Sequence, residues 1–112
     1  MRYLVIILMS FLTISAQAQE KKNKNAKHQI EVKGNCEMCK KRIEKAAFDV
    51  RGVKSANWDL GEKQLSLIID ERRTSINDVE EAIADSGHDT ENVKTTEDNY
   101  ANLHFCCKYD RE

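Results

Sequence analysis

The order in which strand-like and helix-like patterns follow one another constrains the fold of this chain more than any other feature. Residues 28–33 alternate apolar and polar side chains, as a half-buried strand does. Residues 40–50 then carry apolar side chains at helical spacing: Ile43, Ala46, Ala47 and Val50. Residues 53–60 and 64–70 alternate again on either side of a short turn, so they predict a hairpin.

A second helix and a weaker strand complete the pattern. Thr74 or Ser75 can cap this helix, and Ser86-Gly87 ends it. Its apolar stripe consists of Ile76, Val79, Ala82 and Ile83. Residues 88–94 predict the last strand. The order β-α-β-β-α-β therefore predicts an α+β, ferredoxin-like domain, in which a four-stranded antiparallel sheet carries two helices on one face.

The first 18 residues have the pattern of a secretory signal peptide. Arg2 precedes an almost unbroken apolar run over residues 3–14, and Ala16-Gln17-Ala18 forms a small-residue cleavage site. An uncleaved membrane anchor is the other interpretation, although the run is short for a membrane span. The prediction is a periplasmic or secreted protein.

Three further segments follow the predicted signal peptide. Residues 19–27 form a polar linker, residues 28–94 the folded domain, and residues 95–112 a tail that contains two cysteines. A helix that docks through Tyr100, Leu103 and Cys107 is the prediction for the tail, and a flexible tail is the alternative. The net charge is −1, and no basic stretch carries interleaved aromatic residues, so nothing predicts a nucleic-acid partner.

Four cysteines in an exported chain would normally suggest two structural disulfides. Here Cys36 and Cys39 form one close pair, and Cys106 and Cys107 are adjacent. Bonds within these pairs would close very small loops and would constrain the unfolded chain little. Disulfides between the two pairs are a remaining alternative, because the spacing of the cysteines does not determine their connectivity.

The pair Cys36-Glu37-Met38-Cys39 lies where the first strand turns into the first helix. Free backbone N–H groups and the positive end of the helix dipole favour thiolates there, and thiolates bind soft metal ions or attack disulfides. This motif in a β-α-β-β-α-β chain resembles the heavy-metal-associated domain family over residues 28–94. That family includes copper chaperones, domains of copper-exporting pumps and the periplasmic mercury-binding protein. The resemblance implies that Cys36 and Cys39 bind one soft ion.

The loop departs from the family pattern in one respect. The family usually has Gly-Met-x-Cys before the first ligand, whereas this chain reads Gly34-Asn35-Cys36, one residue shorter and without the methionine. Met38 is expected to pack rather than to bind metal, since a thioether more often fills space. Two thiolates beside the neutral Asn35 favour Cu(I), with Hg(II), Ag(I) or zinc as the other metals to consider.

Three residues outside the motif are further candidate ligands. By family position His88 lies beside the metal loop, where an imidazole would coordinate the ion or tune its release, although a solvated histidine is equally expected. Cys106 and Cys107 extend the soft-ligand set if the tail folds back. The competing interpretation is a redox cap, in which a tail cysteine is bridged to Cys36 or Cys39.

These patterns predict an exported metallochaperone or scavenger for Cu(I) that exchanges its ion with a periplasmic or membrane metal-transport protein. A metal-bridged homodimer stays open. The enzymatic alternative is a thiol–disulfide oxidoreductase with Cys36 as nucleophile and Cys39 as resolving thiol. Thioredoxin-like enzymes place a cis-proline beside this motif, and the chain contains no proline, so a non-enzymatic function is preferred.

Overall fold

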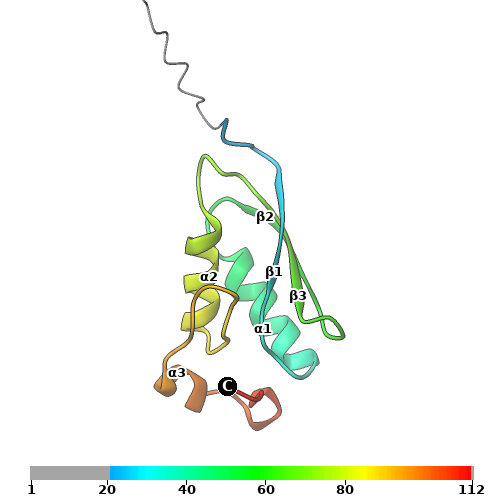
Figure 1. The fold of residues 1–112 in the computed structure, drawn as a ribbon, viewed down its shortest axis with the longest axis vertical. Helices are drawn as coiled ribbons and strands as arrows, with labels where there is room; N and C mark the ends of the chain where they lie inside the picture. The colour runs from blue at the N-terminus through cyan, green and yellow to red at the C-terminus, as the bar shows by residue number, and fades with distance from the viewer. Residues whose placement is uncertain (1–20, 112) are drawn as a thin grey trace, which may run out of the picture.

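The computed structural model describes residues 21–111, so the predicted signal peptide lies outside the described part of the chain. Along the chain the elements are β1 (Ala26–Glu31), α1 (Glu37–Phe48), β2 (Val53–Asp59), β3 (Gln64–Ile69), α2 (Ile76–Asp85), α3 (Glu97–Ala101) and a short 3₁₀ turn, η1 (Phe105–Cys107) (Figure 1). Within residues 21–111, none of these helices has the length and apolar character needed to span a bilayer.

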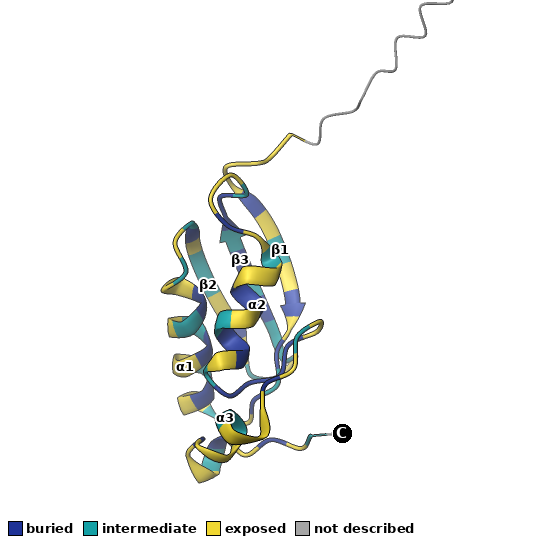
Figure 2. Ribbon diagram, turned by 90° about the vertical axis from the view of Figure 1, so that its left-hand side faces the viewer, coloured by how far each residue is buried: buried dark blue, intermediate teal, exposed yellow. Residues whose placement is uncertain are grey.

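The sheet is antiparallel and has the strand order β1-β3-β2, with β3 in the centre. Helices α1 and α2 lie over one face of it (Figures 1 and 2). The alternation in β3 is obeyed, because Leu65, Leu67 and Ile69 are buried against these helices while the residues between them are half-exposed. The hairpin and both helices predicted from periodicity are therefore present.

The predicted fourth strand is not confirmed. Within the described residues, the segment after α2 joins the sheet through one isolated bridge between Val32 and Thr90. Its polar groups bond elsewhere: the buried carboxylate of Glu80 accepts from the Thr90 hydroxyl (2.6 Å) and from the Asn92 backbone N–H (2.8 Å). The Thr90 N–H donates to the Val93 carbonyl at 2.8 Å. A strand cannot extend where these groups are already paired.

Both predicted helices have capped or well-defined starts. The hydroxyl of Ser75 accepts the Asp78 N–H at 3.2 Å and begins α2. Helix α1 begins at Glu37, three residues before the predicted start, because Cys36 is the extended N-cap residue. The cysteine motif therefore overlaps the first turn of α1 instead of preceding it.

The tail packs onto the domain, although not as one helix. Thr96 caps the short α3, and the chain then bends into η1. The side chains of Leu103, Cys107 and Tyr109 are buried within the same core as the sheet. Figure 2 shows α3 and the following residues at the end of the sheet where α1 begins.

Candidate metal centre

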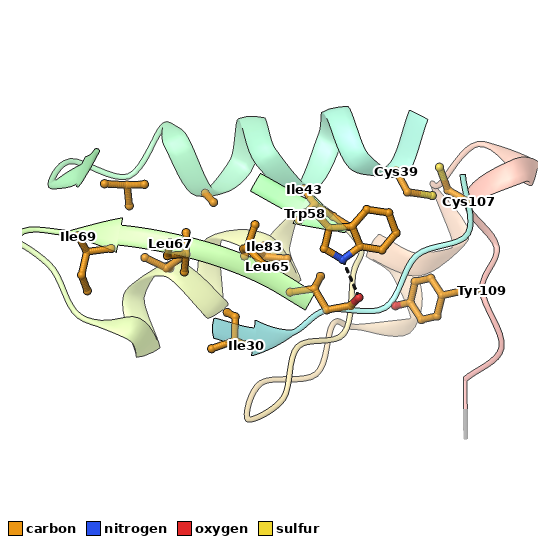
Figure 3. Packing of buried hydrophobic residues seen from close by; sticks show 14 of the residues in the cluster. Ile30, Cys39, Ile43, Trp58, Leu65, Leu67, Ile69, Ile83, Cys107 and Tyr109 are labelled. Carbon is orange, nitrogen blue, oxygen red and sulfur yellow. Dashed lines mark hydrogen bonds between the residues drawn. The ribbon is translucent and has the colours of Figure 1, made fainter. Parts of the chain in front are cut away.

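The cysteine motif lies between the loop after β1 and the tail. Cys36 is half-buried, and Cys39 in the first turn of α1 has no exposed surface. A loop that hands over a metal ion would be expected to expose both sulfur atoms, but of this pair only Cys36 keeps exposed surface. Figure 3 shows why: Cys107 of the tail lies directly beside Cys39.

Trp58 packs against the loop between β1 and α1. Its indole N–H donates to the Val32 carbonyl at 3.0 Å, and the ring is fully buried (Figure 3). A Cβ added at Gly34 would lie 3.0 Å from Cβ of Cys39 and 3.1 Å from the Trp58 ring. The loop therefore needs glycine at position 34 so that the backbone can approach Trp58 closely.

Four sulfur atoms meet at this point, and all four cysteines are free thiols. Sγ of Cys36 lies 3.4 Å from Sγ of Cys39, 2.9 Å from Sγ of Cys106 and 3.6 Å from Sγ of Cys107. The two tail sulfur atoms are 3.9 Å apart. Cys36 is thus the sulfur shared by the motif pair and the tail pair. The three sulfur atoms of Cys36, Cys106 and Cys107 all lie within 4.8 Å of one another.

The surroundings make Cys36 the most acidic of these thiols. Burial alone would raise its pKa, but donation from the Cys106 thiol, the Cys39 backbone N–H and the other two thiols outweighs burial and lowers the pKa from 9.0 to about 7. The pKa of Cys106 is raised because its proton is held by Cys36. Burial, followed by its bonds to Cys39 and Cys36, raises the pKa of Cys107. A single thiolate centred on Cys36 is the favoured ionisation.

Specific contacts hold the tail in place. The buried hydroxyl of Tyr109 accepts the Asp89 backbone N–H at 2.9 Å and donates to the Gly87 carbonyl at 3.0 Å. Arg111 forms a forked pair with the Asp89 carboxylate, at 2.9 and 3.0 Å. Hydrogen bonding to Arg111 outweighs burial and lowers the pKa of Asp89. These contacts fasten the chain on the far side of Cys106 and Cys107.

His88 is neither solvated nor placed in the sulfur cluster. It is fully buried, its Nδ1 lies 2.7 Å from the Lys33 carbonyl, and its ring stacks on Tyr109 with centroids 5.6 Å apart. Nδ1 must carry the proton to make this bond. Nε2 has no hydrogen-bond partner, and burial lowers the pKa of the ring. His88 therefore joins the metal loop to the tail as a neutral ring.

One other expectation about the loop is corrected. The Met38 side chain was expected to pack, yet 43% of its surface is exposed. Lys40 directly follows the cysteine motif, and its amino group contacts Glu44 (2.7 Å), Asn57 (2.9 Å) and the Trp58 carbonyl (2.8 Å). Lys40 therefore ties α1 to the end of β2.

Some residues that shape the site were missed from sequence. Trp58 was noted only as part of an alternating strand, and Tyr109, Asp89 and Arg111 had no assigned role. The signal for Tyr109 was weak but present, since an aromatic residue two positions after Cys107 indicates that the tail has an apolar surface to bury.

Comparison with known proteins identifies the family to which the folded part of the chain is similar. The model of the family described as "Heavy-metal-associated domain" matches residues 27–89. The copper chaperone CopZ of Staphylococcus haemolyticus is 39% identical over 61 residues, which are 54% of this chain and 90% of that protein. A solved CopZ metallochaperone is 30% identical with a TM-score of 0.56 and covers 58% of this chain and 98% of its own. A copper-binding domain from HMA7, a P-type ATPase, also has 30% identity and a TM-score of 0.56, covering 58% and 89%.

Proposed function

This chain belongs to the heavy-metal-associated domain family, and from that premise we propose that it is a carrier of Cu(I) that binds its ion at Cys36 and Cys39. One observation carries the proposal: two free thiols lie 3.4 Å apart at the N-terminus of α1, and the pKa of one is lowered to about 7. A thiolate that forms at neutral pH is the ligand that a soft monovalent ion prefers. The ion is the cargo of the carrier, and it passes by ligand exchange from these thiolates to a partner protein.

The donor set is that of a site for a soft metal ion. Within residues 21–111 the grouped ligands are sulfur atoms without a carboxylate or imidazole among them. Thiolates suit Cu(I), Ag(I) and Hg(II), and four thiolates also bind zinc, so the sulfur ligands by themselves do not separate copper from zinc. The copper chaperone among the relatives supports copper within this group.

The place of action and the partner are also proposals. A cleaved leader over residues 1–18 would place the carrier in the periplasm or outside the cell. Its partner there would be a metal-transport protein of the membrane or periplasm, as the likeness to a P-type ATPase domain supports. A homodimer bridged by shared thiolates is tested by measuring the molar mass of the loaded protein in solution.

Anaerobic Cu(I) titration of the reduced protein against a chromophoric chelator tests the proposal. We expect one tightly held ion per chain, and its loss in the Cys36→Ser/Cys39→Ser variant. Met38→Leu is the matched control, because it alters the same loop and keeps every thiol. Circular dichroism checks that the double variant folds, and Cys36→Ser alone, at a half-buried position, serves if it does not. Full affinity in Cys36→Ser/Cys39→Ser, or in Cys36→Ser if the double variant does not fold, would overturn the proposal.

The enzymatic alternative is separated by a turnover assay. Cys39 is fully buried, so a resolving thiol would not reach a protein disulfide without movement of the tail. We therefore expect insulin reduction no faster than that by free dithiol reagents. Catalytic turnover that depends on Cys36 would favour a thiol–disulfide oxidoreductase instead.

A further inference from the structure

The tail cysteines are the most prominent feature that the proposed function does not use. Cys106 and Cys107 lie 70 and 71 residues after Cys36, and both place their sulfur atoms within 3.6 Å of it. They are adjacent in the 3₁₀ turn η1, and their sulfur atoms are 3.9 Å apart, so both face the same point.

We propose that Cys36, Cys106 and Cys107 form a three-thiolate site for a soft ion. The ion first captured by Cys36 and Cys39 keeps its bond to Cys36, exchanges Cys39 for the two tail sulfur atoms, and the Cys106 and Cys107 thiols release their protons as they bind. The inference rests on the proposed function, since Cys36 belongs to both ligand sets. With this site the carrier should retain its ion longer than a two-thiolate carrier does, because an acceptor must displace the tail thiolates before the ion leaves.

The sulfur spacing fits a shared ion. Three sulfur atoms at about 2.3 Å from one ion stand about 4 Å apart in a trigonal plane. The observed separations are 2.9, 3.6 and 3.9 Å, so opening the Cys36–Cys106 separation by about 1 Å completes the triangle. The 2.9 Å separation also lies about 0.9 Å from the disulfide length of about 2.05 Å, so metal binding is measured on the reduced protein.

The tail is held by contacts that do not involve the sulfur atoms. The Tyr109 hydroxyl and the Arg111 fork fasten it to the segment after α2. Lys108 donates to the Tyr100 and Ala101 carbonyls at 2.9 and 2.7 Å, which closes the short loop around η1. A ligand held in position before the ion arrives loses little entropy on binding, so the tail thiols are effective donors.

A structural role for these cysteines is the competing explanation. Cys107 is fully buried and packs in the core, where a cysteine behaves as a small apolar residue. Cys106 is only half-buried, and nothing in packing requires its sulfur to lie at 2.9 Å from another thiol. The two explanations differ in what the loss of these thiols does to the bound metal.

The test uses the full mature chain, reduced and anaerobic, loaded with Cu(I). We expect X-ray absorption to show three sulfur ligands in the wild type and two in Cys106→Ser/Cys107→Ser, and competition titration to show affinity at least about tenfold weaker in that variant. Phe105→Ser is the matched control, because Phe105 lies in the same turn, is 81% exposed and carries no thiol. It should retain three ligands and wild-type affinity.

Two ligands and equal affinity in the wild type and the double variant would overturn the three-thiolate site. The proposed carrier function would still stand in that case, because it fails only if Cys36→Ser/Cys39→Ser keeps full affinity. If replacing the buried Cys107 unfolds the chain, Cys106→Ser alone decides by the same two measurements. Wild-type coordination and affinity in that variant would reject the proposal.

Discussion

At the scale of single residues, the chemistry of this protein centres on one sulfur atom. Cys36 is the N-cap residue of α1, it is half-buried, and it contacts three other thiols. Because its neighbours can donate S–H and N–H hydrogen bonds, they stabilise the thiolate of Cys36 at the cost of their own ionisation. The four cysteines are thus unequal, although sequence alone presents them as two similar pairs.

Thiol alkylation of the metal-free protein tests this inequality. We expect the iodoacetamide rate at Cys36 to rise with pH and level off above about 7, where its pKa lies. In Cys106→Ala the midpoint should move upward, because the thiol donor that most lowers this pKa is removed. Mass spectrometry of the labelled peptides measures each rate, and Phe105→Ser is the control. An unchanged midpoint in Cys106→Ala would contradict the assigned cause.

At the scale of elements, the segment after α2 links the two halves of the site. Gly87 ends the helix with a φ of +108°, His88 bonds to the loop before α1, and Asp89 bonds to the tail. A Cβ at position 87 would lie 2.7 Å from Cδ2 of Leu103 and 2.9 Å from the Asn99 carbonyl oxygen. The tail can dock only because this position has no side chain.

Gly87→Ala should therefore loosen the tail. We expect a loss of unfolding free energy of about 1–3 kcal/mol, from the positive φ and from the clash with Leu103. Faster hydrogen exchange should appear in residues 95–111. Gly61→Ala is the matched control, because an added Cβ there meets only an Asp59 oxygen at 3.3 Å. Equal exchange of the tail in the two variants would show that Gly87 does not control docking.

At the scale of the whole molecule, a small core is reinforced by buried polar residues at the ends of elements. Trp58, Leu65 and Ile83 fill the space between sheet and helices, and Trp58 also bonds to the Val32 carbonyl (Figure 3). Glu80 organises the segment that replaces a fourth strand. Asp70 closes β3, where its carboxylate accepts two guanidinium N–H bonds from Arg72 at 3.0 Å.

The Asp70 contact predicts a pH dependence of stability. Hydrogen bonding to Arg72 lowers the pKa of Asp70 from 3.8 to about 2. A lowered carboxyl pKa stabilises the fold above pH 4, and this contribution disappears as the pH falls through 2. Asp70→Asn should therefore be less stable than the wild type at pH 7, with a difference that shrinks between pH 4 and pH 2.

Urea unfolding of the reduced protein across this pH range measures the difference. The exposed carboxylate of Asp85 offers the control, since Asp85→Asn should change stability little at pH 7. If the Asp70→Asn difference stayed constant down to pH 2, the ion pair with Arg72 would not be its cause.

Local sequence patterns were enough to predict the elements from β1 to α2 and the strand-to-helix turn that carries the cysteine motif, although α1 begins three residues earlier than expected. Each of these follows from neighbours within one or two turns, such as the alternation of Leu65, Leu67 and Ile69 or the cap at Ser75. Periodicity records which face of an element is apolar, and that information is local.

The construction of the site, by contrast, depends on the tertiary structure. The meeting of Cys36 with Cys106 and Cys107, the burial of His88 against Tyr109 and the loss of the fourth strand to Glu80 all depend on contacts between distant parts of the chain. No local pattern records which side chains the fold brings together across 70 residues. The tail thiols therefore had no defined partners until the positions of α1 and the segment after α2 were known.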